Sequence, residues 1–252
     1  MDLKKYDKDG NLLNLTKAYD RNDKATGSNY YDWYKNDVTR FDPTAEDIKC
    51  ELQLQLLGDF EALALRPSVQ KFKQEVKTAE FVPYLRREGV SNDREGILLV
   101  GLEGDKPTDS LSRPEAMKRS GRILKETDFN TPTSAYAHFE SLHSILDYWT
   151  GLGRTMIVKT NKGGWFPPHR DSPIVTRDSF RIICFLGNSD TNNYEWWLGD
   201  YRRTITPNTT YYVDTTKVHR THSWNDDSYH LILNVPKTWE NVIKLTSILE
   251  NP

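Results

Sequence analysis

The sequence predicts an α+β fold whose core is a double-stranded β-helix, or jelly roll, flanked by α-helices. Helical patterns dominate roughly the first 150 residues, and several short β-type segments separated by turn residues follow them. Short strands at this spacing are typical of a sandwich or barrel, whereas a parallel sheet needs a helix between successive strands. We expect an N-terminal arm and helical support in residues 1–152, and the jelly-roll core with a C-terminal helix in residues 153–252, packed as one integrated domain.

The composition is that of a soluble protein with one large domain. Of 252 residues, 37% are apolar and 28% are charged, and the formal net charge is −2. Nucleic-acid-binding domains usually carry a strong basic excess, which this chain lacks. No run approaches the ~18 apolar residues of a membrane span, and the N-terminus lacks the apolar core of a signal peptide. We therefore expect a cytoplasmic protein with neither a nucleic-acid nor a membrane partner.

Cysteine usage also limits the possibilities. Cys50 and Cys184 are the two cysteines, and both lie in apolar surroundings far apart in the sequence. Disulfide scaffolds and cysteine-based zinc sites need more thiols at closer spacing. Both residues are expected to be reduced thiols in the core.

The N-terminal region is predicted to be an irregular arm followed by a helix. Residues 1–43 are rich in Asp, Asn, Lys and Tyr with little periodicity, and the aromatic cluster at 30–34 would dock the arm on the body. Thr44 and Asp47 form a capping-box pattern, which predicts the start of a helix. Apolar residues recur at helical spacing from there as far as Leu63, before a proline ends the pattern.

Four further elements are expected before residue 150. A second helix should span residues 69–80, and the apolar run 96–101 between glycines predicts a buried strand. Residues 102–133 contain many turn formers and predict a long loop with one short helix, of the kind that often forms a lid or binding segment. Residues 134–149 predict an amphipathic helix stopped by glycines. The basic side chains of the long loop either surround a binding site or are simply solvated: Lys106, Arg113, Lys118, Arg119 and Arg122.

The remaining sequence predicts the strands of the jelly roll. The candidate strands are Arg154–Thr160, Trp165–His169, Phe180–Leu186, Tyr194–Leu198, Tyr201–Thr206, Thr210–Val213 and Tyr229–Val235. Turn residues at 199–200 and 207–208 separate neighbouring strands. A final helix should follow Pro236 and Lys237.

A His-x-Asp pair stands at the start of this strand region. His169 and Asp171 are two residues apart, so on an extended chain their side chains point to the same face. Pro167 and Pro168 hold the preceding backbone extended, and glycines at 163–164 provide a turn into it. Such tripeptides are common by chance, so the pair gains meaning only from its position and partners.

Other histidines supply the missing ligand. His219 follows the next several strands, and His222 lies three residues further on. Two imidazoles and one carboxylate can hold a non-haem Fe(II) ion while leaving coordination positions open. His138 and His143 lie on the predicted amphipathic helix, where ordinary packing or surface contacts are expected.

Four segments together carry a family resemblance. They are Gly-Gly-Trp-Phe-Pro-Pro-His-Arg-Asp (163–171), Phe-Arg-Ile-Ile-Cys-Phe-Leu (180–186), Tyr-Tyr-Val-Asp-Thr-Thr-Lys-Val-His-Arg (211–220) and Tyr-His-Leu-Ile-Leu-Asn-Val (229–235). With them, residues 153–236 resemble the Fe(II)/2-oxoglutarate-dependent oxygenases, particularly the aspartyl/asparaginyl β-hydroxylase and proline hydroxylase branch. Nothing before residue 150 resembles a family that can be named.

The resemblance implies a catalytic metal site and its chemistry. His169, Asp171 and His219 would be the iron ligands, because the Asp-Thr-Thr-Lys-Val-His run is similar to the family's approach to its distal histidine; His222 is the alternative. Fe(II), 2-oxoglutarate and O2 would together hydroxylate an unactivated C–H bond and release succinate and CO2. Related halogenases replace the aspartate with a small residue, so Asp171 favours hydroxylation.

The resemblance also exposes a departure from the family pattern. Many members carry an arginine about ten residues after the distal histidine that binds the 2-oxoglutarate carboxylate, but here no Arg or Lys lies between Arg220 and Lys237. Two replacements are available for cofactor binding. Arg181 occupies a position where the branch also carries an arginine that contacts 2-oxoglutarate, and His230 could point inward on the last strand. The alternatives are a surface strand residue and a buried neutral histidine.

The branch implies that the substrate is an amino acid, a peptide side chain or a related small polar metabolite. Two other functions stay open at this point. One is a non-enzymatic cupin-like module that binds a metal or ligand. The other is a zinc hydrolase that uses the same ligand set and works without O2 or 2-oxoglutarate.

Overall fold

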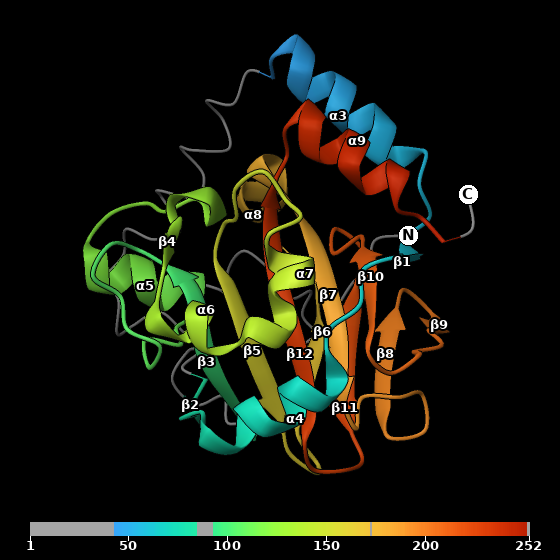
Figure 1. The fold of residues 1–252 in the computed structure, drawn as a ribbon. Coiled ribbons are helices and arrows are strands. Elements are labelled where there is room, and N and C mark those ends of the chain that lie inside the picture. The colour runs from blue at the N-terminus through green and yellow to red at the C-terminus, as the bar shows by residue number, and fades with distance from the viewer. Residues whose placement is uncertain (1–42, 85–92, 172, 251–252) are drawn as a thin grey trace, which may run out of the picture.

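The computed structural model describes residues 43–84, 93–171 and 173–250, so the predicted arm lies outside the described residues except for Pro43. Two antiparallel sheets face each other and enclose the interior of a barrel (Figure 1). Because helices flank this double-stranded β-helix, the predicted α+β class is confirmed.

The larger sheet has eight strands and contains most of the barrel. In order of hydrogen-bonded neighbours they are β1 (Phe60–Leu63), β10 (Thr209–Val213), β7 (Ser179–Gly187), β12 (Ser228–Pro236), β5 (Thr155–Thr160), β3 (Arg94–Gly101) and β2 (Val82–Pro83), with β4 (Thr131–Pro132) paired to β3. The chain before residue 153 therefore supplies strands as well as helices to the fold.

The smaller sheet has four strands and closes the barrel on the opposite side. Its order is β6 (Trp165–His169), β11 (His219–Ser223), β8 (Tyr194–Leu198) and β9 (Tyr201–Arg202). The central strand β11 does not appear among the predicted strands, because all of its residues are polar. His219, Thr221 and Ser223 are buried, and they alternate with the more exposed Arg220 and His222. A polar interior of this kind hides the hydrophobic period by which half-buried strands are recognised.

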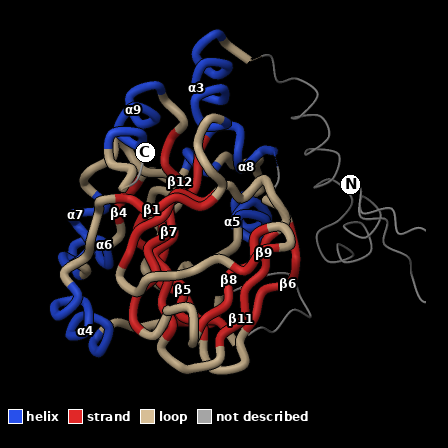
Figure 2. Tube along the Cα trace, turned by 90° about the vertical axis from the view of Figure 1, so that its right-hand side faces the viewer, coloured by secondary structure: helices blue, strands red, loops and turns tan. Residues whose placement is uncertain are grey.

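Helices pack on the side of the larger sheet that faces away from the smaller sheet (Figure 2). Those that contribute to the main core on this side are α3 (Ala45–Gln55), α4 (Val69–Thr78), α6 (Ser134–His138), α7 (His143–Leu146) and α9 (Trp239–Ser247), with the 3₁₀ turn η2 (Glu140–Leu142). Helix α5 (Arg113–Ser120) belongs instead to a separate apolar group, and α8 (Pro173–Asp178) and the 3₁₀ turn η1 (Glu126–Asp128) are the other helical elements of the described residues. Figure 1 shows α3 and α9 lying side by side at one end of the molecule.

The two faces of the larger sheet differ in their role. Outward-facing Ile182, Leu231 and Leu233 are fully buried and pack with Phe139 and Leu142 of the helical layer in the main core. Burying each such side chain contributes about 1.5–3 kcal/mol. The inward-facing residues form two smaller apolar groups, one around Ile183, Phe185 and Trp196 and the other around Leu98, Met156 and Val158.

Helix α3 begins as predicted but ends earlier. Asp47 N–H donates to Thr44 Oγ1 over 3.1 Å, and Thr44 N–H donates to an Asp47 carboxylate oxygen over 2.8 Å. The helix stops at Gln55, and β1 follows it. The prediction of a helix as far as Leu63 was therefore wrong, because β1 gains its structure from pairing with the distant β10 and not from local spacing.

The helix predicted for residues 134–149 is broken into α6, η2 and α7. Phe139 has a non-helical backbone (φ −91°, ψ 58°) and interrupts the hydrogen-bond ladder. The apolar positions were nevertheless assigned correctly, since Phe139, Ile145 and Leu146 are almost completely buried. Burial can thus follow a helical period across a broken helix.

The other predicted elements agree more closely with the structure. The helix expected at 69–80 is α4, the strand expected at 96–101 lies within β3, and β6 and β8 have their predicted bounds. The strand predicted as Tyr201–Thr206 is only the two-residue β9, which pairs with the last two residues of β8, Trp197 and Leu198. Both cysteines are free and buried, as predicted.

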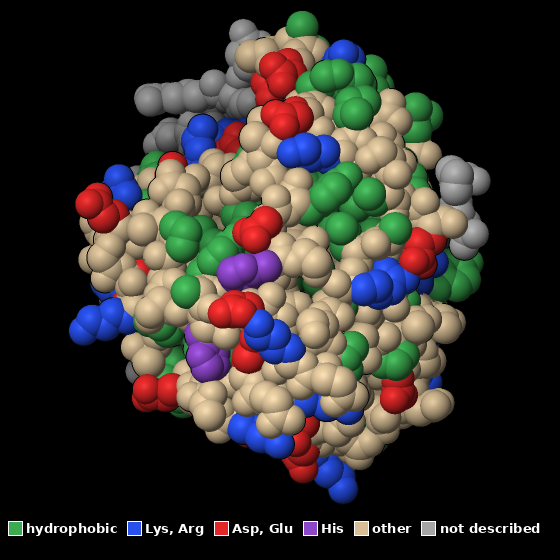
Figure 3. Space-filling model, in the orientation of Figure 1, with side chains coloured by type: hydrophobic (Ala, Val, Ile, Leu, Met, Phe, Trp, Pro, Cys, Tyr) green, Lys and Arg blue, Asp and Glu red, His purple; other side chains and the backbone are tan. Residues whose placement is uncertain are grey.

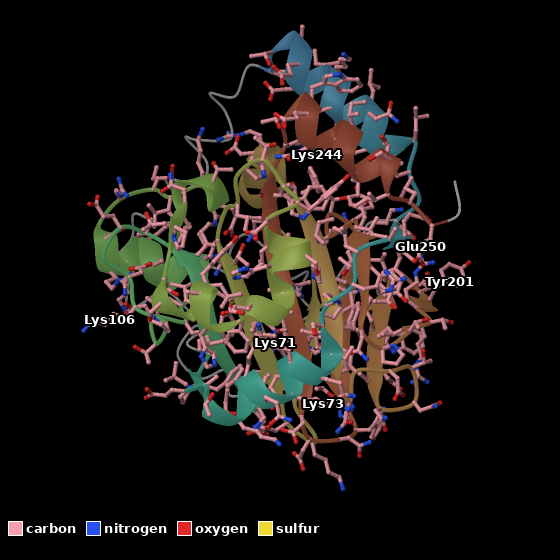
Figure 4. The ribbon with its side chains drawn as sticks, viewed as in Figure 1. Lys71, Lys73, Lys106, Tyr201, Lys244 and Glu250 are labelled. Atoms are coloured by element: carbon pink, nitrogen blue, oxygen red, sulfur yellow. The ribbon has the colours of Figure 1, made fainter. Side chains whose placement is uncertain are left out.

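The basic residues of the long loop do not form one rim. Arg113 is buried and donates to the carbonyl oxygen of Leu124 over 3.0 Å. Arg119 pairs with Asp109 over 2.6 Å and with Asp105. Lys106 turns outward at the periphery (Figure 4). The visible face in Figure 3 carries acidic and basic side chains interspersed, as the small net charge predicts.

Within the described part of the chain, helices are too short or too polar for any of them to traverse a bilayer.

Candidate metal centre

A β-bulge in β6 sets the direction of His169, the first candidate ligand. His169 pairs with His219, but two residues further along β11 the partner of Thr221 is Phe166, so β6 has one extra residue in this interval. The extra residue is accommodated at Pro167 and Pro168, which have no N–H to donate to the ladder. The bulge allows Phe166 and His169, which are three residues apart, both to lie on the barrel side; their ring centres are 4.2 Å apart.

Three predicted ligands converge at this point. One ligand atom from each of His169, Asp171 and His219 lies within 4.8 Å of the other two. His169 Nε2 lies 3.9 Å from Asp171 Oδ1, and the imidazole ring centres of His169 and His219 are 4.1 Å apart. Asp171 lies just beyond β6, where its backbone N–H donates to Thr215 O over 2.9 Å.

Each imidazole is oriented by a hydrogen bond through its other nitrogen. His169 Nδ1 lies 2.9 Å from Pro167 O, and His219 Nδ1 lies 3.0 Å from Lys217 O. Because a carbonyl only accepts, both Nδ1 atoms carry the proton and both Nε2 atoms present a lone pair. Metal-binding histidines are held in the same way in known metal sites. The parallel ring of Trp196, 5.6 Å from that of His219, further fixes its orientation.

The carboxylate is held by an arginine. Arg181 Nη2 donates to Asp171 Oδ2 over 2.7 Å, which leaves Oδ1 directed toward His169. Burial alone would raise the pKa of Asp171, but Arg181 and the two imidazoles hold that pKa well below its usual range. Asp171 is therefore an anion at neutral pH, as a metal ligand must be.

These residues fit a divalent metal that accepts nitrogen and oxygen ligands. The donor set of two imidazole nitrogens and one carboxylate oxygen matches the facial arrangement of non-haem Fe(II) sites, in which other positions stay open. The alternative ligand His222 points the other way, because it alternates with His219 and Thr221 along β11. Its ring contacts that of Trp224 on the outer surface, with centres 4.2 Å apart.

Arg181 and His230 both face the interior of the barrel, but they differ in their hydrogen-bond partners and in what they can still bind. Arg181 uses one guanidinium nitrogen on Asp171. His230 is buried on β12, with Nε2 3.2 Å from Ser189 Oγ. The Ser189 hydroxyl donates its proton to Tyr229 O, so His230 must donate to Ser189 and offers only an acceptor nitrogen to the barrel. Burial and the nearby Arg94 place the pKa of His230 well below its ordinary value.

The sequence prediction missed two inward-facing residues near the metal centre. Trp196 lies on the same face of β8 as Tyr194 and Leu198, so the two-residue period of a strand could have placed it inside the barrel. Arg94 opens β3, two residues before the apolar run that marked this strand in the sequence. The period of β3 puts Arg94 on the same face as Leu98, but a charged residue is not normally expected inside a barrel.

Comparisons with known proteins find solved structures of low similarity to this chain. No family model and no curated protein matches the chain. A 2OG-Fe(II) oxygenase family oxidoreductase from Burkholderia pseudomallei is 13% identical, with 78% of this chain and 93% of that chain covered and a TM-score of 0.41. A prolyl-4-hydroxylase from Pseudomonas putida is 8% identical, with 74% and 98% covered and a TM-score of 0.39. A predicted oxalate decarboxylase from Thermotoga maritima is 13% identical, with 39% and 76% covered and a TM-score of 0.28.

At identities of 13 and 8% and TM-scores of 0.41 and 0.39, these similarities assign no function, and the reasons for assigning one come from the site itself.

Proposed function

We propose that this chain is an Fe(II)- and 2-oxoglutarate-dependent oxygenase that hydroxylates an unactivated C–H bond of a small polar substrate. The observation that supports it best is the convergence of His169, Asp171 and His219 within 4.8 Å, inside a jelly roll. A structural zinc site would normally use four protein ligands, whereas three ligands leave positions for small molecules.

The chain's own residues would hold and orient the reacting groups. His169 and His219 would bind iron through Nε2, since both Nδ1 atoms are bound to carbonyl oxygens. Asp171 would bind through Oδ1, because Arg181 holds Oδ2. Iron with 2-oxoglutarate and O2 supplies the oxidising power, and succinate and CO2 are released. The aromatic walls formed by Phe166 and Trp196 would limit access of water to the metal.

The substrate belongs to the proposal in its general class only. An amino acid, a peptide side chain or a related metabolite fits the branch that the sequence resembles. A screen of such compounds for substrate-dependent succinate release would identify it.

The metal and co-substrate assignment is tested by anaerobic titration of the metal-free protein with Fe(II) and then 2-oxoglutarate. We expect a weak visible metal-to-ligand charge-transfer band that appears only when both are present. Asp171→Ala and His219→Ala should each abolish it. His222→Ala is the matched control from the same strand and should leave it unchanged, because His222 faces outward.

The two other candidate functions give different results in the same experiment. A non-enzymatic metal-binding module would bind the ion but show no band with 2-oxoglutarate. A zinc hydrolase would be active with Zn²⁺ in the absence of O2 and 2-oxoglutarate. Loss of metal binding in His222→Ala but not in His219→Ala would show that the ligand assignment is wrong.

A further inference from the structure

Arg94 is a cation directed into the barrel. It lies opposite Thr160 in the β3–β5 ladder, and Thr160 in turn lies opposite Ser228 in the β5–β12 ladder. The three side chains therefore form one row across the inner face of the larger sheet, because directly paired residues project to the same side. Leu98 lies on the same face of β3 as Arg94, and Met156 lies on the same face of β5 as Thr160; both belong to an inward-facing apolar group, so this face is the inner one.

Arg94 has no anionic partner among the residues that the structure describes. Its Nε atom is buried without a hydrogen-bond partner. Burial lowers the pKa of Arg94, and the groups that oppose this effect are the phenols of Tyr194 and Tyr84 instead of a carboxylate. The guanidinium carbon lies 4.7 Å from the ring centre of Phe166 and 5.3 Å from that of Tyr84. Cation–π contacts of this kind offset only part of the free-energy cost of burying a charge.

The other inward-facing arginines differ from Arg94 in this respect. Arg154 forms a bidentate pair with Glu126, with contacts of 2.7 and 2.9 Å. Arg181 donates to Asp171. In the described part of the barrel, Arg94 is thus the arginine whose charge is not matched by the protein. A buried polar group without a partner in a native protein calls for an explanation, and a ligand is one.

The unmatched guanidinium lies close to the metal centre. Both groups lie against the Phe166 ring: the guanidinium carbon of Arg94 is 4.7 Å from its centre, and the imidazole centre of His169 is 4.2 Å from it. A five-carbon diacid that binds the metal at one end can therefore reach Arg94 with the other. The indole Nε1 of Trp196, whose ring stacks on that of His219, is also buried without a hydrogen-bond partner.

Hydroxyl groups complete the polar surroundings of Arg94. The hydroxyl of Tyr194 lies beside those of Thr160 and Thr221, deep between the two sheets. The His230 ring packs against that of Tyr194, tilted by 43° with ring centres 4.2 Å apart, and burial holds the pKa of His230 well below its ordinary value. Because its Nε2–H is used on Ser189, His230 has no proton to offer a carboxylate.

We propose that Arg94 binds the carboxylate of 2-oxoglutarate that is remote from the metal, in the role for which the sequence suggested Arg181 or His230. The inference rests on the proposed function. It assigns the anchoring charge to β3, a strand outside the 153–236 segment that resembles the oxygenases. The planar guanidinium can form two parallel hydrogen bonds to a carboxylate, which gives both affinity and orientation.

The test compares 2-oxoglutarate with 2-oxopentanoate, which has the same chain length and keto-acid end but no remote carboxylate. Both are titrated anaerobically against the full chain loaded with Fe(II), and the charge-transfer band reports binding. Wild-type protein should bind 2-oxoglutarate at least about 30-fold more tightly than 2-oxopentanoate, as expected for a buried charged pair. Arg94→Met should remove most of this preference and leave Fe(II) affinity unchanged. Arg94→Lys, which keeps the charge but loses the planar fork, should give an intermediate preference.

Arg220→Met is the matched control. Arg220 also lies over an aromatic ring, 4.6 Å from the centre of Trp197, but on the outer face of the smaller sheet. Its substitution should not alter the preference. If Arg94→Met and Arg94→Lys keep the wild-type preference, or if Arg181→Met removes it while preserving Fe(II) binding, Arg94 is not the anchor. If wild-type protein with bound Fe(II) shows no band with either acid, the proposed function fails instead.

A second measurement separates a ligand-binding arginine from a structural one. In the metal-free and ligand-free protein, Arg94→Met should leave the urea unfolding midpoint unchanged or raise it, because an unmatched buried charge is removed. Arg154→Met should lower the midpoint clearly, because it leaves Glu126 buried and unpaired. A comparable loss in both variants would assign Arg94 to the fold and overturn the proposal.

Discussion

The buried ion pair between Glu126 and Arg154 gives a prediction whose size follows from its geometry. Glu126 is 1% exposed and accepts hydrogen bonds of 2.7 and 2.9 Å from Arg154. In Glu126→Gln the side chain keeps its shape but leaves the guanidinium without a counter-charge. Breaking a buried pair by removing one partner costs about 3–5 kcal/mol of unfolding free energy. Urea denaturation at pH 7 measures this loss directly.

An exposed pair serves as the control for that variant. Glu95 is 35% exposed and lies 3.6 Å from Lys159, so Glu95→Gln should cost less than about 1 kcal/mol. Equal losses in Glu126→Gln and Glu95→Gln would refute the reasoning, because burial would then not determine the energy.

The pH dependence of the same variant tests its electrostatic origin. Burial alone would raise the pKa of Glu126, but Arg154 lowers it below its ordinary value. A carboxyl whose pKa is lower in the folded state stabilises the protein above its unfolded pKa, about 4.3, and this contribution disappears as the pH falls through the folded pKa. The difference between wild type and Glu126→Gln should therefore shrink below about pH 4. A constant difference down to pH 3 would indicate a packing defect.

Three further predictions concern the core and the turns. Phe185→Ala should cost about 3–5 kcal/mol in urea denaturation, because Phe185 is fully buried between the sheets; a loss below 1 kcal/mol would contradict this. Gly187→Ala should destabilise more than Gly121→Ala: both have positive φ (63° and 68°), but only at Gly187 would a Cβ meet a backbone oxygen, at 2.4 Å, while Gly121 has open space. Cys50 and Cys184 are both fully buried, and burial raises the pKa of Cys184 to about 12. Both thiols should therefore resist thiol reagents until the protein unfolds. Rapid labelling of the native protein would disprove their burial.

Sequence reasoning succeeded where local pattern and burial coincide. β8 alternates clearly between buried and half-buried residues, and the His-x-Asp pair, together with the resemblance that favoured His219, identified three residues that the fold brings together. It failed where structure depends on distant partners. β1 looks like the continuation of a helix, and only its pairing with β10 makes it a strand.

The candidate site shows the same limit. The sequence could predict that Arg181 lies near the proposed metal ligands, but not that it donates to Asp171. Arg94 escaped notice because its importance comes from what surrounds it: a position inside the barrel, two aromatic rings and no carboxylate among the described residues. Hydropathy patterns record which residues are apolar and carry no information on whether a charge is matched.

The bulge in β6 has a consequence for how the protein opens. β6 is an edge strand, and neither Pro167 nor Pro168 contributes an amide to its ladder, so β6 is held to β11 by few main-chain hydrogen bonds. Local detachment of this strand should then need less free energy than global unfolding. A metal joining His169 on β6 to His219 on β11 would fasten that edge, because it binds only when the two strands are together. Amide hydrogen exchange in β6 should therefore slow selectively when Fe(II) is added. Such slowing would indicate that Fe(II) binds at the proposed site and stabilises the pairing of β6 with β11.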